Sequence, residues 1–363
     1  MLTPCAFWIL FDSRLIDLTS FLMLIKISVY FMAVLNILII CSILAHKNKL
    51  FLNNYFVLKR KSFTTHLYAI FSMLFWGLSY VWSKIVFEYY SPLTTVFLRL
   101  VLSALFLLGY IMIMQKAEKI KKRIDYWLFP LSALFNPFLY FLGESYGLNL
   151  VSPSVSAIII ATIPLFTPLL AFIAYRERIS SLNIFGILIS FIGITVMILK
   201  PDLSFRADPL GILYLFGGVA AALIYTLILK RLTVRYSPLC IITYQNVIGI
   251  FYFLPFFLLF HYEEFIRVKP NFELISSLLM LAVFASSLAF IFYTVAIRNL
   301  GMSKANVYSN LIPVFTAVFA FFTIGEQFDL IKITGILIVV IGLSLSQKSR
   351  IRIYTDSEQI CND

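Results

Sequence analysis

Charged side chains are scarce in this sequence of 363 residues: Asp, Glu, Lys and Arg together make up 13%, about half of what soluble proteins carry. Hydrophobic residues make up 61%, and the mean hydropathy is +0.95. A water-soluble fold of this length has too little interior to bury so much apolar surface. The composition therefore predicts an all-α polytopic membrane protein, which at roughly 20 residues per span has no room for a soluble catalytic domain.

Cysteine and histidine are also scarce, which limits the chemistry that the chain can carry. The four cysteines form no CxxC pair, and the three histidines form no metal-binding cluster. The sequence therefore predicts no disulfide, no metal site and no cofactor. It also lacks the GxSxG, phosphate-loop and HExxH motifs, so nothing in it indicates an enzyme.

Ten apolar runs are long enough to cross a bilayer, and an eleventh run, 27–45, precedes them. Because backbone in contact with lipid must satisfy its own hydrogen bonds, all are expected to be helices. The ten runs are 67–87, 93–114, 126–148, 154–175, 182–199, 209–229, 239–260, 274–297, 305–324 and 330–346.

The net charge of +12 is distributed as membrane topology requires. Basic residues lie in short clusters between the apolar runs rather than on a solvated face, so nucleic acid is not an expected partner. Counted on alternate sides of the ten runs, twenty Lys and Arg residues fall on one side and six on the other. By the positive-inside rule, the richer side is cytoplasmic, and so are both ends of the ten-helix core.

The two halves of the core repeat each other. Five pairs of identical residues share an offset of 149, and the turn Tyr90-Ser91-Pro92-Leu93 recurs as Tyr236-Ser237-Pro238-Leu239. The chain is therefore predicted to be a duplication of a five-helix unit. Because five is odd, the second copy enters the membrane from the opposite side. The five pairs are Pro164 and Pro313, Thr167 and Thr316, Glu177 and Glu326, Gly186 and Gly335, and Gly193 and Gly342.

Inverted repeats are typical of secondary transporters, because two similar halves of opposite orientation can exchange conformations. Substrate then binds near the midplane, where the halves meet. The alternative is that duplication merely built a larger bundle.

The motifs resemble those of the EamA-like family in the drug/metabolite transporter superfamily. The resemblance rests on Trp76-Gly77-Leu78-Ser79 followed by Lys84, Pro92 and Arg99, and on a twice-repeated series of proline, glutamate and two glycines. It implies ten helices and the export or exchange of small metabolites. The organisation is then an N-terminal extension (1–65), a first repeat (67–199), a second repeat (209–346) and a cytoplasmic tail (347–363).

The sequence departs from the family pattern in two places. The run 27–45 precedes a core that is complete without it, so it is a genuine extra span, a dispensable anchor or the product of an upstream start assignment. In addition, Gln245 takes the place of Arg99 in the second copy, so the halves are electrostatically unequal.

Glu144 is the main candidate for a functional residue. It lies in the third run, and a carboxylate in or near hydrocarbon costs roughly 2.5–3.5 kcal/mol on insertion scales. It is therefore a candidate proton carrier, unless it already lies in interfacial water. Arg99, in the second run, either binds an anionic substrate group, pairs with Glu144, or extends to the outer interface.

A polar stripe lies on one predicted face of the ninth run: Asn306, Ser309, Asn310 and Pro313 follow the spacing i, i+3, i+4, i+7. The repeat-equivalent face in the fourth run, with Pro164, is apolar. We expect the stripe to line a midplane cavity bounded by the first, third, fourth, sixth, eighth and ninth runs, although helix–helix hydrogen bonding is the alternative. Pro164 and Pro313 are expected to bend their helices.

Aromatic side chains supply the remaining candidates for substrate binding. Trp76, Tyr80, Tyr140 and Tyr225 could form cavity walls, including cation–π surfaces for an amine. With 17% aromatic residues, each could equally face lipid or the core.

These observations predict a secondary transporter in a cell inner membrane, working by alternating access. Its expected substrate is a small amino-acid-like or drug-like metabolite, its expected direction is export, and proton coupling or exchange would drive it. The alternative is a non-transporting membrane scaffold or sensor. The expected partners are the small-molecule substrate and the lipid bilayer, with the protein a monomer or homodimer.

Overall fold

The computed structural model describes residues 54–115, 118–166, 181–198, 207–300, 305 and 308–360. The chain divides into two units, 1–61 and 62–363. Of the first unit, only residues 54–61, where helix α2 begins, are described. The predicted extra helix 27–45 lies outside the described residues.

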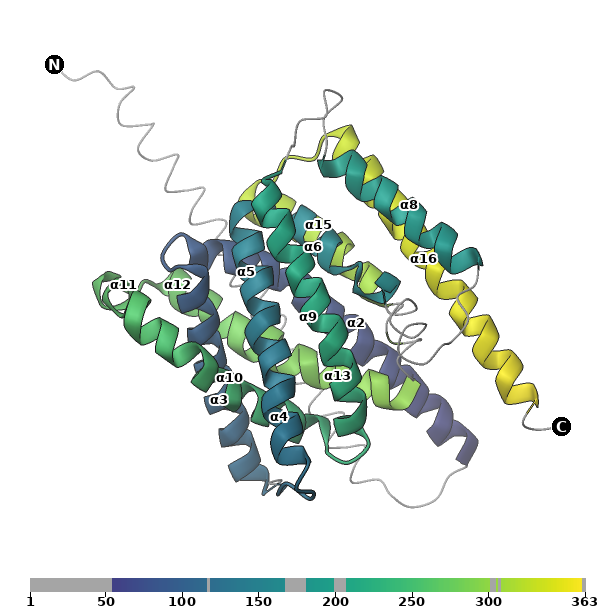
Figure 1. Cartoon of the computed structure of the whole chain (residues 1–363), viewed down its shortest axis with the longest axis horizontal. Helices are drawn as coiled ribbons and strands as arrows, with labels where there is room; N and C mark the ends of the chain where they lie inside the picture. The colour runs from purple at the N-terminus through teal and green to yellow at the C-terminus, as the bar shows by residue number, and fades with distance from the viewer. Residues whose placement is uncertain are drawn as a thin grey trace. The chain divides into compact units, whose positions relative to one another are not determined.

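The second unit is built from helices throughout its described residues (Figure 1). In the first repeat these are α2 (Asn54–Phe87), α3 (Pro92–Met114), α4 (Asp125–Ala133), α5 (Tyr140–Leu150), α6 (Pro153–Ile160) and α8 (Ser181–Ile198). In the second they are α9 (Pro209–Thr233), α10 (Pro238–Phe256), α11 (Tyr262–Arg267), α12 (Phe272–Met280), α13 (Ala289–Leu300), α15 (Leu311–Ile324) and α16 (Leu330–Ile360). Five helical stretches in the described residues are long and apolar enough to cross a membrane. The all-α prediction is confirmed.

Serine–proline pairs fix where several of these helices begin. Ser91, Ser152 and Ser237 each cap a helix, accepting a backbone N–H with the side-chain oxygen, and proline follows as the first helical residue. Proline suits that position because it has no N–H to leave unpaired. The recurring Tyr-Ser-Pro-Leu motif is therefore the signal that starts α3 in one repeat and α10 in the other.

The third predicted span, 126–148, is not one continuous helix. A π-helical turn, Leu134–Leu139, separates α4 from α5, and inside it Asn136 has φ −147° and ψ 116°, outside the helical region. Pro137 explains the break, because proline disfavours a helical conformation in the residue before it and cannot donate a backbone hydrogen bond. As a result, the side chains after the break start on a new helical axis.

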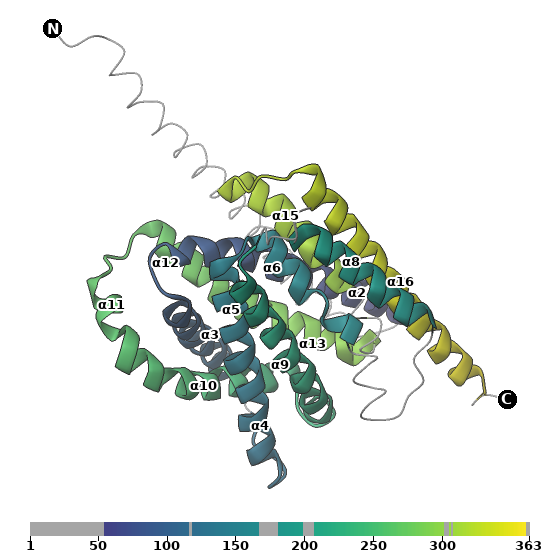
Figure 2. The ribbon, with the colours of Figure 1, turned by 45° about the horizontal axis from the view of Figure 1, so that its top comes forward.

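Helices α8 and α16 pack against each other side by side, as Figures 1 and 2 show. A Cβ atom on Gly186 would lie 2.6 Å from the carbonyl oxygen of Gly342, and one on Gly193 would lie 2.9 Å from that of Gly335. These glycines therefore allow the two helices to pack closely. As the residue number rises in one helix it falls in the other, so these repeat-equivalent helices are antiparallel.

A second glycine-lined contact joins α5 to α9. A Cβ atom on Gly143 would lie 2.7 Å from the backbone nitrogen of Gly218, and one on Gly147 would lie 2.9 Å from the carbonyl oxygen of Gly211. These helices too run antiparallel, and both views show them alongside each other (Figures 1 and 2). Close backbone approach through small residues is the usual way in which helices associate in membranes.

The two ends of the second unit carry related carboxylate contacts. At one end, which we call the Ser91 end, the backbone N–H of Ser91 donates to Glu264 at 2.6 Å. At the other, the Ser237 end, the backbone N–H of Ser237 donates to Glu118 at 3.3 Å. Ser237 follows Ser91 by 146 residues, and Glu264 follows Glu118 by the same 146, the offset of the repeated turn. The contacts thus follow the inverted duplication, and the Ser91 end is the one predicted to face outward.

Candidate functional site

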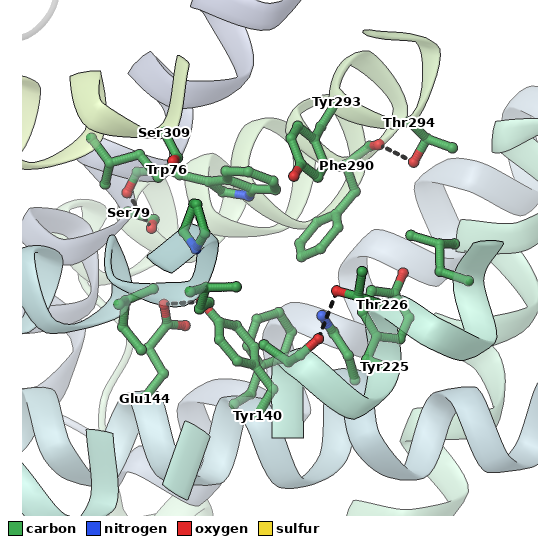
Figure 3. A pocket seen from close by; sticks show the side chains of 18 of the residues that line it. Trp76, Ser79, Tyr140, Glu144, Tyr225, Thr226, Phe290, Tyr293, Thr294 and Ser309 are labelled. Carbon is green, nitrogen blue, oxygen red and sulfur yellow. Dashed lines mark hydrogen bonds between the residues drawn. The ribbon is translucent and has the colours of Figure 1, made fainter. Parts of the chain in front are cut away.

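A pocket of about 110 Å³ lies between the two repeats (Figure 3). Its walls come from α2, from α5 and the π-helical turn before it, from α6, α9 and α13, and from the start of the ninth predicted span. These elements belong to the first, third, fourth, sixth, eighth and ninth apolar runs, the six runs that the sequence predicts as the boundary of a midplane cavity. Arg99 of α3 adds a seventh wall, which the sequence analysis does not include.

Glu144 faces this pocket from α5 and is held by two tyrosine hydroxyls. Tyr140, one turn earlier on the same helix, donates to Glu144 Oε1 at 2.7 Å, and Tyr80 of α2 donates to the same oxygen at 3.0 Å. Both hydrogen bonds go to a carboxylate, which makes them stronger than bonds between neutral groups. The second carboxylate oxygen, Oε2, belongs to neither bond. Glu144 therefore presents an oriented, half-buried acid to the pocket.

Arg99 lines the pocket and is only 3% exposed, so it does not extend to the outer interface. Its Nε donates to the hydroxyl of Ser286 at 2.8 Å, and its guanidinium carbon lies 4.3 Å from the centre of the Phe141 ring. The ring face attracts the cation, so Phe141 stabilises the charge while it excludes water. No ion pair joins Arg99 to Glu144 in the described residues, although both face the same pocket.

The second repeat places neutral groups where the first has charges. Gln245, the counterpart of Arg99, donates through Nε2 to the hydroxyl of Ser132 at 3.2 Å and accepts from the hydroxyl of Tyr225 at 3.2 Å. Tyr293, the counterpart of Glu144 at the offset of 149, lines the pocket as well. The formal charges of the pocket therefore come from the first repeat, as the substitution of Gln245 for Arg99 predicts.

Aromatic rings form much of the wall opposite Glu144. Trp76 meets Phe290 and Tyr293 edge to face, with ring centroids 5.1 and 5.0 Å apart, and Phe290 also meets Phe141 at 6.2 Å. Figure 3 shows Phe290 and Tyr293 directed toward the same central space as Tyr140 and Tyr225. The predicted site residues Trp76, Tyr80, Tyr140 and Tyr225 all line this pocket.

The polar stripe of the ninth span behaves differently from the prediction. Ser309 lines the pocket, but Asn310 does not: its side-chain amide donates to Ser344 of α16 at 3.3 Å. Residues Tyr308–Asn310 form a 3-10 turn before α15 begins, so the i, i+3, i+4 spacing of a regular α-helix does not apply. Asn306 lies outside the described residues.

The two prolines also differ in position. Pro164 lines the pocket just after α6 ends at Ile160, which agrees with proline preventing a hydrogen bond to that carbonyl. Pro313 is the third residue of α15, where a helix needs no donor from the backbone nitrogen. It therefore lies in the first turn of a regular helix rather than at a bend in the middle.

The sequence patterns do not single out several lining residues, notably Asn136, Phe290 and Thr294. Asn136 carries a usable signal, since an Asn-Pro pair inside an apolar run indicates a helix break. The other two have none, because one aromatic or one threonine among many cannot be assigned to a face without the helix packing.

Comparison with known proteins agrees with this architecture. The family model of the EamA-like transporter family matches residues 63–199 and again residues 209–347. This chain belongs to the EamA-like transporter family. It is accordingly a polytopic membrane protein of a transporter family, as the repeated motifs indicate.

The relatives of this EamA-like protein are archaeal and bacterial. It is 28% identical to an uncharacterized transporter of Archaeoglobus fulgidus over 77% of this chain and 97% of the relative. It is 24% identical to the uncharacterized transporter YetK of Bacillus subtilis, over 79% of this chain and 88% of YetK. A solved crystal structure shares the fold with a TM-score of 0.60 at 14% identity, covering 78% of this chain and 98% of the other.

Proposed function

We propose that this EamA-like protein is a secondary transporter that moves a small organic metabolite across the inner membrane by alternating access, in the direction of export. The substrate would be an amphipathic, amino-acid-like solute. The observation that carries the proposal is the pocket, in which one acid and one base face the same space without pairing with each other.

The charges of Arg99 and Glu144 would favour a solute that carries both a negative and a positive group. Arg99 presents a guanidinium that suits a carboxylate, and Glu144 presents a carboxylate that suits an amine. An unpaired buried charge costs several kcal/mol, so a ligand that neutralises both would bind favourably. The rings of Trp76, Phe290 and Tyr293 would then contact the apolar part of the solute.

Glu144 also supports coupling to protons. It is the acidic side chain among the residues that line the pocket, and its charge is one that a proton can remove. If a proton and the amine group of a solute compete for Glu144, the outward flow of solute is driven by the inward flow of protons. Solute exchange is the alternative source of energy.

A non-transporting scaffold or sensor is the competing function. A scaffold needs no polar space between its repeats, whereas this pocket contains a charge of each sign. The proposal therefore treats the protein as a transporter rather than as an enzyme or a scaffold.

The test begins with the solute. Metabolites in the medium of overexpressing cells are compared with those of deletion cells, and the solute that differs is used in counterflow with purified protein in liposomes. Arg99→Gln should raise the half-saturation concentration at least tenfold, which is about 1.4 kcal/mol.

Arg267→Gln is the matched control, because Arg267 is exposed and pairs with Glu263 four residues away. It should leave counterflow unchanged. If the media of the two cell types contained the same solutes, the proposed transport would be contradicted. An Arg99→Gln variant with wild-type affinity would contradict the proposed site.

A further inference from the structure

The pocket is bounded by two groups of helices that meet at the Ser91 end. Helices α5, α6 and α9 form one group, with α5 and α9 joined by their glycine contact. Helices α2, α13 and α15 form the other: a Cβ atom on Gly77 of α2 would lie 2.7 Å from Phe315 of α15, and the hydroxyl of Thr316 donates to the Gly77 carbonyl at 3.1 Å. Residues of both groups line the pocket, so contacts that join the groups at this end lie between the pocket and the Ser91 end.

Glu326 makes such a contact. It follows the end of α15, and its side chain is only 6% exposed. Its Oε2 accepts from the backbone N–H of Ser154 at 3.4 Å and from the Ser154 hydroxyl at 3.0 Å. Ser154 is the second residue of α6, so the carboxylate lies at a helix N-terminus, where negative charge is favourable. Figure 2 shows α6 and α15 next to each other. One side chain thus bridges the two groups.

Two lysines complete this arrangement. Lys332, at the start of α16, donates to Glu326 Oε1 at 3.2 Å and to the carbonyl of Gln327 at 3.0 Å. Lys84, near the end of α2, donates to the carbonyl of Asn149 near the end of α5 at 3.2 Å, which also links the two groups at the Ser91 end. We call Glu326, Ser154, Lys332, Lys84 and Asn149 the Ser91-end clamp.

The pocket lies on the inner side of this clamp and extends toward the Ser237 end. Tyr80 and Glu144, which line the pocket, lie about 10 Å and about 9 Å short of the ends of α2 and α5 at the Ser91 end. In contrast, Ile297 lies within about 5 Å of the end of α13 at the other side. The structure therefore combines a closed Ser91 end with a pocket that reaches toward the Ser237 end.

We propose that the Ser91-end clamp is a gate, in which Glu326 holds α6 and α15 together and must release Ser154 before the pocket can open to the Ser91 end. This proposal rests on the alternating access of the proposed function. Glu326 is a positioning residue: it lines no part of the pocket and acts by holding the two helix groups.

The experiment measures the reactivity of a single pocket cysteine in vesicles. The four natural cysteines are replaced by alanine, Ser79→Cys is introduced in the pocket wall, and a membrane-impermeant maleimide is added from one face at a time. Exposed Glu88→Cys, in a separate sample, identifies the face of the Ser91 end. With Glu326 intact, Ser79→Cys should react mainly from the Ser237 side. Glu326→Gln should raise its rate from the Ser91 side roughly tenfold, the effect of about 1.4 kcal/mol.

Glu264→Gln is the matched control. Glu264 is also a carboxylate at the Ser91 end that accepts from a helix N-terminus, but it joins α3 to α11 and does not line the pocket. It should not change the rate. Ser154→Ala removes only the hydroxyl contact, so it should raise the rate less than Glu326→Gln, and it replaces that variant if Glu326→Gln does not fold.

Equal rates in Glu326→Gln and the parent, or an equal rise in Glu264→Gln, would overturn the gate. The assay needs no solute, so its result stands even if the proposed function fails to identify one. Conversely, transport activity with no change in labelling would remove the gate and leave the transporter.

Discussion

Gly143 offers a quantitative test of the helix packing that positions Glu144. A Cβ atom on Gly143 would lie 2.6 Å from the Tyr214 carbonyl oxygen, 2.7 Å from the Gly218 nitrogen and 2.9 Å from the Gly218 Cα. All three are backbone atoms, which cannot turn aside as a flexible side chain does. Gly143→Ala therefore forces α5 and α9 apart.

The magnitude follows from two opposing effects. Overpacking a tight contact costs about 1–3 kcal/mol, whereas replacing glycine by alanine inside a helix gains about 0.5–1 kcal/mol. Because the neighbours are backbone, we expect the cost to dominate, with a net loss of about 1–2 kcal/mol in the free energy of unfolding. The displacement also moves Glu144, the next residue, away from Tyr80 on α2.

The α9 glycines next to this contact supply matched controls. A Cβ atom on Gly218 would meet its nearest neighbours at 3.4 Å, an ordinary contact, and one on Gly217 would meet nothing within 4 Å. Gly218→Ala and Gly217→Ala should therefore each gain about 0.5–1 kcal/mol from the helix preference of alanine. Unfolding in mixed micelles with increasing dodecyl sulfate, followed by tryptophan fluorescence, measures all three. A Gly143→Ala variant as stable as Gly217→Ala would refute the packing described here.

Three further predictions test other parts of the account. Asn310→Ala should lose about 0.6–2 kcal/mol of stability in the same micelle assay, because its amide bonds to Ser344 outside the pocket. Its solute affinity in counterflow should not change. A lower affinity at unchanged stability would place Asn310 in the site. Reporter fusions after Ser346 and within residues 116–123 should both report the cytoplasm, and an external signal at either would contradict the predicted topology. Deletion of residues 1–47 should leave membrane insertion and transport intact, since both family matches begin after them; loss of inserted protein would show that the extension is part of the fold.

The fold can be predicted from the sequence because its signals are local or repeated. Apolar runs define the helices, and the Ser-Pro pairs at Ser91 and Ser237 mark where two of them begin. The pairing of Gly186 with Gly335 at a fixed offset reveals the duplication, and the opposite directions of α8 and α16 follow from it. These features need no knowledge of long-range contacts.

The site could be predicted only in outline. Burial of a charge in a span indicates Glu144 and Arg99, but the tyrosine hydroxyls that hold Glu144 depend on how α2 packs against α5. Asn310 is predicted on the wrong face because a short 3-10 turn shifts the helix phase. The repeat identifies Glu326 as the counterpart of Glu177, but its contact with Ser154 crosses from one repeat to the other and depends on how α6 packs against α15.

Proton-driven flux in liposomes is the most direct test of the claim that transport runs through the pocket between the repeats. The wild-type protein, Glu144→Gln, Arg99→Gln and the exposed-site control Glu88→Gln are reconstituted with the solute identified from the growth media, and flux is measured with and without an imposed pH gradient. The account predicts that Glu144→Gln weakens the response to the gradient while counterflow of preloaded solute persists, and that Glu88→Gln behaves as wild type. An unchanged response in Glu144→Gln would contradict proton coupling through this residue, and wild-type flux in both Glu144→Gln and Arg99→Gln would show that transport takes place elsewhere.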